Sequence, residues 1–352
     1  MLALTELDTP QPVIDRQIMR ANIAAMQALC NQHHIANTPH FKTHKSVELA
    51  KLQLAAGATA LCCQTLSEAE VIAHEIGCDV IICHQLLGAA KIERLRQVAS
   101  MVNLTMICDN AVVAKYLSEC FAALSTPVDI LVECDTGMAR SGVVAPQTAA
   151  SLAKYISTLP GLNFAGLLLY PPDDQIERAQ AFLDQARQLI EAEGLSIARI
   201  SNGGTPGLPN IGILGETEYR AGTNIFHDRM QMGKGVATDA DCALTIYTTL
   251  VSSAEPGRGI LDAGSKTLTS DLTLFDDFGY LPDYPNARIY KLAEEHGFLD
   301  FSQCEHKPQI GEIIRVIPNH VCPVVNLQDE ILSVEDGTWA APVRVDARGR
   351  RR

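Results

Sequence analysis

The chain has 352 residues, with 28 Lys and Arg against 41 Asp and Glu, which gives a formal net charge of −13. At about 150 residues per domain, this length predicts two domains or one large domain with an appendage. Hydrophobic residues make up 47% and charged residues 20%, a composition that excludes disorder and collagen-like structure. The acidic balance argues against nucleic acid or an anionic membrane as partner.

No part of the sequence predicts a membrane span or an export signal. The chain contains no run of about 18 uncharged apolar residues, and its first residues lack the basic and apolar regions of a signal peptide. Its eleven cysteines include no CxxC pair and mostly fall in apolar runs. We therefore expect a cytoplasmic protein with reduced thiols, and we interpret the basic run at 347–352 as a solvated end.

Short apolar runs alternate with longer amphipathic stretches over the first two thirds of the chain. The runs that predict strands are 39–43, 59–64, 79–84, 103–109, 128–135, 164–170, 198–203 and 218–226. The stretches that predict helices include 67–76, 89–99, 111–124, 145–158 and 174–192. Eight buried strands separated by helices indicate a (β/α)8 TIM-type barrel over residues 11–230. A doubly wound open sheet is the alternative, but its Gly-rich turn after the first strand is absent.

The pattern changes after residue 230. Short strand-like runs follow one another, separated by turns that contain Gly or Pro, at 244–252, 258–263, 313–317, 321–327, 330–334 and 339–345. Helical periodicity is largely lost in this part of the chain. We therefore expect residues 231–352 to form a mostly-β domain that follows the α/β barrel.

Lys42 lies in an apolar run where an ordinary strand would carry Val or Ile. Functional residues of barrels gather at the carboxyl ends of the strands, and a desolvated Lys at such an end is suited to imine formation. The alternative is a strand-end Lys that reaches solvent.

Two Gly-Thr loops close late strands, Gly203-Gly204-Thr205 after Ser201 and Gly222-Thr223 further on. Late barrel strands often end in phosphate sites, because glycines let backbone N–H groups converge. Alone, each loop could be a tight turn. Together with Lys42 they favour a phosphorylated cofactor such as pyridoxal phosphate.

His320 and Cys322 stand two residues apart in the expected β domain. On a strand, such residues point to the same face, so the imidazole and the thiolate could reach one ion. This donor pair suits zinc, with water or substrate in the remaining positions. A chance pair on a strand is the alternative, since the motif alone is weak.

Six motifs occur in the order found in one known family. They are Pro39-His40-Phe41-Lys42-Thr43-His44-Lys45, the segment 62–70, Asp135-Thr136-Gly137-Met138-Ala139-Arg140-Ser141-Gly142, the segment 261–266, Glu294-Glu295-His296-Gly297 and His320-x-Cys322. In these motifs the chain resembles the D-threonine aldolase and D-serine dehydratase family of alanine racemase-like, fold-type III pyridoxal phosphate enzymes. The resemblance runs from near residue 10 to near residue 335.

The resemblance implies a role for each matching residue. Lys42 would be the catalytic residue that carries the cofactor through an imine. The other cofactor-binding residues would be Gln64, Arg140, Tyr170, Ser201, Gly203, Gly204, Thr205, Arg220, Gly222 and Thr223. His320 and Cys322 would hold a divalent metal, zinc or manganese. The family architecture implies a barrel, a β domain that also takes up residues 1–10, and a homodimer.

The resemblance leaves the reaction open. The leading prediction is a lyase that cleaves D-3-hydroxy amino acids to glycine and an aldehyde. The alternatives are a dehydratase that gives a keto acid and ammonia, an amino-acid racemase and a non-catalytic cofactor carrier. Cys322 resembles the dehydratase branch, whereas residues 323–327 look more like the aldolase branch, and Thr38 departs from the Arg common in the family.

Overall fold

The computed structural model describes residues 7–352, which form two compact units. The barrel unit consists of residues 26–42, 49–222 and 350–352, and the β unit of the described residues up to 25 together with 43–48 and 223–349. Of residues 1–10, which the resemblance assigns to the β domain, the first six lie outside the described residues. No helix in residues 7–352 combines the length and apolar character needed to cross a membrane.

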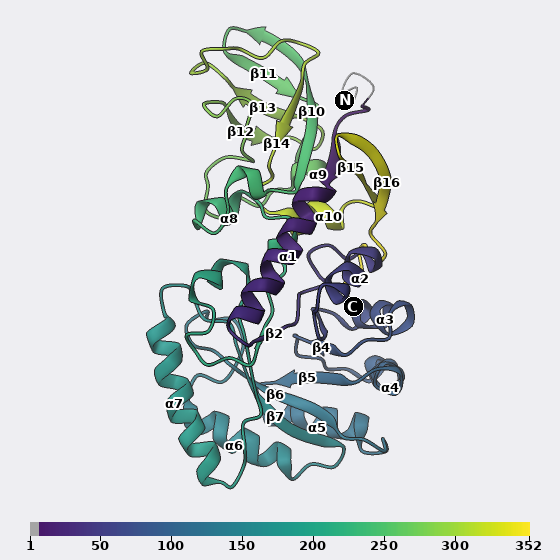
Figure 1. The fold of residues 1–352 in the computed structure, drawn as a ribbon, viewed down its shortest axis with the longest axis vertical. Coiled ribbons are helices and arrows are strands. Elements are labelled where there is room, and N and C mark those ends of the chain that lie inside the picture. Colours follow the sequence, from purple (N-terminus) through teal and green to yellow (C-terminus); the bar gives the residue numbers. More distant parts are fainter. Residues whose placement is uncertain (1–6) are drawn as a thin grey trace. The chain divides into compact units, whose positions relative to one another are not determined.

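A parallel eight-stranded sheet forms the core of the barrel unit, in the order β2-β9-β8-β7-β6-β5-β4-β3 (Figure 1). Its strands are β2 (Ala36–Asn37), β3 (Leu61–Cys63), β4 (Val80–Ile82), β5 (Leu104–Cys108), β6 (Val128–Cys134), β7 (Leu162–Leu169), β8 (Arg199–Asn202) and β9 (Glu218–Tyr219). A parallel bridge between His40 and Cys62 connects the two ends of this order. The sheet therefore curls into the predicted barrel.

Helices follow the strands, as a parallel sheet requires. They are α3 (Leu66–Glu75), α4 (Ile92–Met101), α5 (Ala111–Phe121), α6 (Pro146–Ser157) and α7 (Ile176–Ala192), while α1 (Arg16–Gln32) and α2 (Val47–Ala55) contain residues of both units. In α7 the buried face includes Phe182, Leu183 and Ile190. The α/β prediction is confirmed, because these side chains recur at the helical period seen in the sequence.

The first predicted strand, 39–43, is wrong. Only His40 makes a strand-type bridge, and Phe41–His44 form turns. Polar residues follow Phe41 directly, and the chain enters the β unit at Thr43, so no apolar run remains to extend the strand. The predicted strand 218–226 is likewise short: β9 ends at Tyr219, and a 3-10 helix covers Thr223–Ile225.

The β unit contains a second sheet in the order β12-β13-β11-β10-β1-β15-β16, with β14 paired to β10. Its strands are β1 (Gln11–Asp15), β10 (Leu244–Glu255), β11 (Arg258–Leu261), β12 (Arg288–Leu292), β13 (Gly297–Asp300), β14 (Ile313–Val316), β15 (Glu330–Glu335) and β16 (Thr338–Arg344). Strand β1 runs antiparallel to β10 and parallel to β15. The start of the described chain is therefore part of the interior of this sheet.

Three short helices complete the β unit, namely α8 (Arg229–Gly233), α9 (Ser265–Leu268) and α10 (Val321–Asn326). The prediction of a strand at 321–327 is therefore wrong. Its apolar residues Val321, Val324 and Val325 recur at intervals of three and four, and all three are buried on one side of α10. A six-residue apolar run does not distinguish these two periods clearly.

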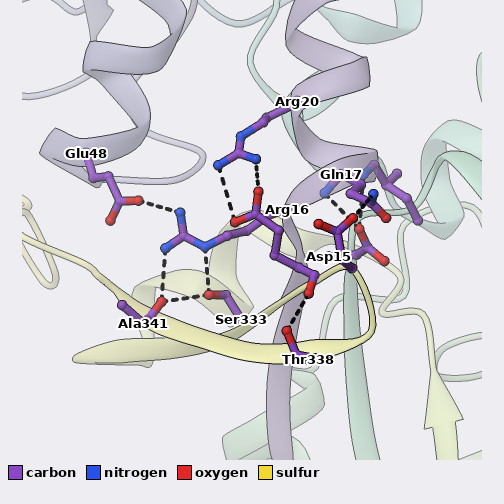
Figure 2. A network of polar contacts seen from close by, with 11 residues as sticks. Asp15, Arg16, Gln17, Arg20, Glu48, Ser333, Thr338 and Ala341 are labelled. Carbon is purple, nitrogen blue, oxygen red and sulfur yellow. Dashed lines mark hydrogen bonds and ion pairs between the residues drawn. The ribbon is translucent and has the colours of Figure 1, made fainter. Parts of the chain in front are cut away.

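Arg16 ties the residues that follow Lys42 to the second sheet (Figure 2). Its guanidinium group is buried and donates to Ser333 Oγ at 2.8 Å, to Glu48 Oε1 at 2.6 Å and to the carbonyl of Ala341 at 2.9 Å. All three contacts lie within the β unit, and they use every donor-bearing nitrogen of the guanidinium group.

The segment 43–48 has two further attachments to the end of the β unit. The Val47 amide donates to Asp346 Oδ2 at 2.8 Å, and the Ala347 amide donates to the carbonyl of Lys45 at 3.0 Å. The segment that follows Lys42 is therefore attached to the β unit at Lys45, Val47 and Glu48.

We predict that Arg16→Gln lowers the free energy of unfolding by about 2 kcal/mol or more, because it removes the three hydrogen bonds of a buried guanidinium group and leaves the buried Ser333 hydroxyl without its charged donor. Arg20 provides the matched control: it pairs with Glu335 one turn further along α1, and both side chains are partly exposed. Arg20→Gln should cost less than about 1 kcal/mol. Urea unfolding measures both, and equal losses would contradict a special role for Arg16.

Candidate active site

Lys42 and Gln64 meet at the strand ends of the barrel unit. Lys42 Nζ lies 3.4 Å from Gln64 Oε1. Gln64 itself is held in place by two hydrogen bonds. Its side-chain Nε2 donates to the carbonyl of Cys83 at 2.9 Å, and its backbone N–H donates to Glu68 Oε2 at 2.7 Å. Glu68 also forms a capping box with Thr65 at the start of α3. The helix start therefore fixes the partner of the Lys42 amine.

Arg220 places a permanent positive charge inside the same barrel. The residue is buried, and its guanidinium group donates to Ser201 Oγ at 2.5 Å and to the carbonyl of Leu169 at 2.8 Å. Both acceptors are neutral, so no carboxylate cancels the charge in these two contacts. Arg220 and Ser201, both predicted site residues, are thus brought together.

His40 is a buried residue whose role the sequence analysis did not identify. Burial, followed by the positive charges of Lys42 and Arg220, holds the pKa of His40 well below its usual value. Its Nδ1 atom is buried and has no hydrogen-bond partner within residues 7–352. The imidazole is therefore neutral and offers one polar atom that no described protein group satisfies.

The predicted phosphate loop has glycines where side chains would collide with aromatic rings. Gly203 has a φ of +91°, and a Cβ there would run into the ring of Tyr219. A Cβ on Gly204 would lie 2.5 Å from the ring of Tyr170, and the carbonyl of Gly204 accepts from Tyr219 Oη at 3.0 Å. Thr205 then begins a short 3-10 helix. These contacts require the two glycines and bring Tyr170 against the loop.

Arg140 bridges Tyr170 to a carboxylate that the sequence analysis missed. Its guanidinium carbon lies 5.4 Å from the centre of the Tyr170 ring, and Nη2 lies 3.7 Å from Glu133 Oε1. Glu133 is buried near the end of β6 and also accepts from Gln85 Nε2 at 2.7 Å and Ser141 Oγ at 3.0 Å. A carboxylate that follows the apolar run 130–132 in this strand was the available signal.

His320 and Cys322 lie in the β unit, and the reason given for their proximity was wrong. His320 caps the start of α10 and Cys322 lies within that helix, so the two do not share a strand face. Their side chains nevertheless interact directly. The Cys322 thiol also donates to Thr43 Oγ1 at 3.4 Å, and Thr223 Oγ1 lies 3.9 Å from Cys322 Sγ.

Asp271 orients the His320 imidazole, a contact that nothing in the sequence spacing indicates. Its Oδ2 atom lies 2.8 Å from His320 Nδ1. Burial lowers the pKa of His320, but the interactions with the Cys322 side chain and the Asp271 carboxylate outweigh it and raise the pKa to about 9. Asn319 secures the loop that carries Asp271, because its Nδ2 donates to the carbonyl of Asp271 at 3.1 Å.

The donor chemistry of this cluster fits a divalent cation. A carboxylate on one ring nitrogen fixes an imidazole so that its other nitrogen can bind a metal, and thiolate and imidazole both suit zinc. Residues 7–352 contain no group of three or more His, Cys, Asp or Glu side chains arranged around one position. A metal held by His320 and Cys322 would therefore have two ligands from this pair, with water or substrate in its remaining positions. His296 lies apart, in the turn between β12 and β13.

Two family models match the chain in succession. The alanine racemase N-terminal domain matches residues 14–229, and a putative serine dehydratase domain matches residues 243–334. The chain belongs to the D-threonine aldolase and D-serine dehydratase family. This identification confirms the resemblance seen in the sequence and places the chain among the alanine racemase-like, fold-type III enzymes.

Individual relatives cover the whole chain. A D-threonine aldolase from an Arthrobacter species is 32% identical over 98% of this chain and 94% of its own. A D-threo-3-hydroxyaspartate dehydratase from Delftia is 30% identical over 91% of this chain and 92% of its own. The crystal structure of a D-threonine aldolase from Filomicrobium marinum superposes with a TM-score of 0.91 at 28% identity, covering 99% and 98% of the two chains.

The structure groups the predicted site residues in two sets. In the barrel unit, Lys42 contacts Gln64, Arg220 contacts Ser201, and Tyr170 lies against Arg140 and Gly204. Thr223, His320 and Cys322 form the second set in the β unit. Gly222 is the last residue of the barrel segment and precedes Thr223 directly. Their roles toward a cofactor or a metal stay predictions.

We predict a pH dependence of stability that comes from His40. Below about pH 6.5 the unfolded chain protonates this imidazole and the folded protein does not, so the free energy of unfolding falls by up to about 1.4 kcal/mol per pH unit. The His40→Asn variant should lack this part of the slope. Urea unfolding of the cofactor-free protein between about pH 7 and pH 5 measures it.

The exposed His74 of α3 supplies a control for this measurement. His74→Asn should keep the wild-type slope. Equal slopes in the wild type and His40→Asn would contradict a neutral, buried His40.

Proposed function

We propose that the protein is a lyase that cleaves D-3-hydroxy amino acids between Cα and Cβ, giving glycine and an aldehyde, with pyridoxal phosphate and a divalent metal as cofactors. One observation carries the proposal. The residue after Lys42, Thr43, contacts Cys322 Sγ, and consecutive Cα atoms are about 3.8 Å apart. Lys42, which carries the amine, is therefore bonded directly to a residue that contacts Cys322, one of the two proposed metal ligands.

The barrel residues fit pyridoxal phosphate. Lys42 would carry it, with Gln64, Arg140, Tyr170 and Ser201 around the ring. The phosphate would be held by Gly203, Gly204, Thr205, Gly222 and Thr223. Buried polar atoms without protein partners in residues 7–352, such as His40 Nδ1 and Asn202 Oδ1, support a polar ligand here. When bound, the cofactor supplies an electron sink for the charge that develops at Cα.

Arg220 would hold the pyridine nitrogen in its unprotonated state. A guanidinium group has only donors and stays charged, so the atom that it faces must accept. Its contacts with Ser201 and Leu169 fix its direction before any ligand binds. A neutral His40 adds no positive charge to that of Lys42, Arg220 and Arg140, which all act on its imidazole.

His320 and Cys322 would hold the divalent metal, zinc or manganese, which supplies a Lewis acid at the β-oxygen of the substrate. Asp271 would keep the imidazole oriented through Nδ1. Cleavage requires that the β-hydroxyl lose its proton and that Cα gain one after the bond to Cβ breaks. The Lys42 amine is the group of this chain that we assign to the proton at Cα.

A dehydratase reaction is the second candidate, supported by Cys322 as a metal ligand and by the Delftia relative. It would use the same residues, with Lys42 removing the Cα proton before the hydroxyl leaves. The racemase candidate needs no metal. We further propose, from the family, that the protein acts as a homodimer, which light scattering on the purified protein tests.

Incubation with D-threonine, D-serine and their L-isomers tests the function. We expect glycine and acetaldehyde from D-threonine and no reaction of the L-isomers. Ammonia with a keto acid would select the dehydratase, and interconversion of isomers without cleavage would select the racemase.

We predict that Lys42→Ala loses the visible absorbance of the lysine-bound cofactor and lowers lyase activity at least about a thousandfold. Lys51→Ala, which removes an exposed amine of α2, should keep both. Spectra and initial rates of the purified variants measure this. Normal absorbance in Lys42→Ala would contradict the assignment.

We predict that His320→Ala and Cys322→Ala each lose the bound metal, and that Asp271→Asn weakens metal binding about 10- to 100-fold. Elemental analysis after dialysis against metal buffers measures the content. His296→Ala, an exposed histidine of the same unit, should keep full metal content. Metal retained by the His320 and Cys322 variants would show that other groups bind it.

A further inference from the structure

A cavity with basic walls opens beside β3 and β4 in the barrel unit. Its volume is about 610 Å³. Gln64 lines one part of it, and the ionisable side chains around the rest are His84, Lys91, Arg94, Arg351 and Arg352. Four of the lining residues are cationic and none is acidic, although the chain as a whole carries a net charge of −13. The cavity therefore favours negatively charged ligands.

A larger cavity of the same unit is lined by ionisable side chains that are mainly acidic. It has a volume of about 870 Å³ and lies at the other ends of the strands. Asp79, Asp129 and Glu218 line it, beside the single cation Arg199. Of these two cavities of the barrel unit, the one with basic walls lies at the carboxyl ends of the strands, where barrel enzymes bind their substrates.

Three of the four cationic side chains that line the basic cavity have no acidic side chain as partner within the described residues. Arg94 pairs with Glu70, with Nε 2.5 Å from Oε1 and Nη2 2.8 Å from Oε2. Lys91 Nζ donates to a backbone carbonyl, that of Leu87, at 2.8 Å. Within residues 7–352 no acidic side chain pairs with Lys91, Arg351 or Arg352. These three side chains can therefore meet an incoming anion.

Backbone contacts hold residues 350–352 at the cavity. The carbonyl of Arg352 accepts from the Ser67 amide at 2.9 Å and from Arg94 Nη2 at 3.2 Å. The carbonyl of Arg350 accepts from Thr65 Oγ1 at 3.1 Å. The basic run that the sequence analysis interpreted as a solvated end is thus attached to the first turn of α3, and its side chains remain exposed.

Gln64 connects this cavity to the reacting amine. It lines the cavity, and its Oε1 atom lies 3.4 Å from Lys42 Nζ. A substrate whose Cα sits at Lys42 can therefore extend its Cβ substituent past Gln64 toward the cations. The methyl group of threonine would leave most of a 610 Å³ cavity unfilled.

We propose that the cavity selects D-3-hydroxy amino acids whose Cβ carries an extended substituent ending in a carboxylate. This inference rests on the proposed function and specifies its substrate class. Lys91, Arg351 and Arg352 are the specificity-determining residues, since cationic donors bind carboxylates through strong, charge-assisted hydrogen bonds. The aldehyde released from such a substrate carries the same carboxylate.

The test uses the reverse reaction, in which glycine adds to an aldehyde. The holoenzyme is given glycine with 4-carboxybenzaldehyde or with 4-methylbenzaldehyde, which differ in charge and little in shape. We expect kcat/KM for the carboxylated aldehyde to be at least about tenfold higher. In the double variant Lys91→Gln/Arg351→Gln this ratio should fall to near one, and it should decrease with rising salt in the wild type.

The control is Lys115→Gln, which removes an exposed cation of α5 outside the cavity and should keep the wild-type ratio. Thermal unfolding verifies that the double variant is folded. A ratio near one in the wild type, or an unchanged ratio in the folded double variant, overturns the proposal.

A direct binding measurement distinguishes a failure of this inference from a failure of the proposed function. If neither aldehyde reacts with glycine, the retro-aldol function is contradicted, and calorimetric titration of the holoenzyme with terephthalate decides the inference by itself. We expect terephthalate to bind the wild type and to bind the double variant at least about tenfold more weakly, with no such difference for 4-methylbenzoate. Equal affinities in both proteins overturn it.

Discussion

The position of the Lys42 amine depends on how the next six residues are held. The chain leaves the barrel unit at Lys42, and residues 43–48 belong to the β unit. There the buried Arg16 binds Glu48 (Figure 2). Thr43 accepts from the Cys322 thiol. A lysine at the end of an isolated strand would move with its loop, whereas this one precedes a segment fixed at both ends. The β unit therefore fixes the backbone segment that directly follows Lys42 in the chain.

Positive charge near Lys42 favours anionic ligands at this end of the barrel. Arg220 is buried and bound to neutral acceptors, and His40 is kept neutral by burial and by the cations around it. A phosphorylated, carboxylate-bearing ligand would bring the negative charge that balances this arrangement. The basic cavity lined by Gln64 extends the same preference outward along the strand ends. Cofactor, substrate carboxylate and substituent would thus all be recognised by positive charge in a chain that is acidic overall.

The sequence predicted the barrel well because its signal repeats. Each strand is a short apolar run, and each helix, such as α7, shows a full amphipathic face. The prediction was wrong where elements are short or irregular. The run at 321–327 is too short to separate the helical period from that of a strand, and the strands β12 and β13 were not predicted because polar and buried residues alternate in only four or five positions.

Some residues of the candidate site could likewise be predicted from the sequence, and others could not. Lys42, Gln64 and Arg220 could be found because each is a polar residue at a strand end, in a motif that resembles a family. Glu133, His40 and Asp271 could not be assigned roles, because their importance depends on partners distant in sequence: Gln85, Arg220 and His320 respectively. His320 and Cys322 were paired correctly for a wrong reason, since a helix start brings them together.

Reduction of the holoenzyme with borohydride, followed by peptide mapping, tests the central claim most directly. The treatment makes the bond between the cofactor and its lysine permanent, so mass spectrometry identifies the residue. The account predicts one pyridoxyl group per chain, on the peptide that contains Lys42. A pyridoxyl group on any other lysine, or none in protein that cleaves D-threonine, would contradict it.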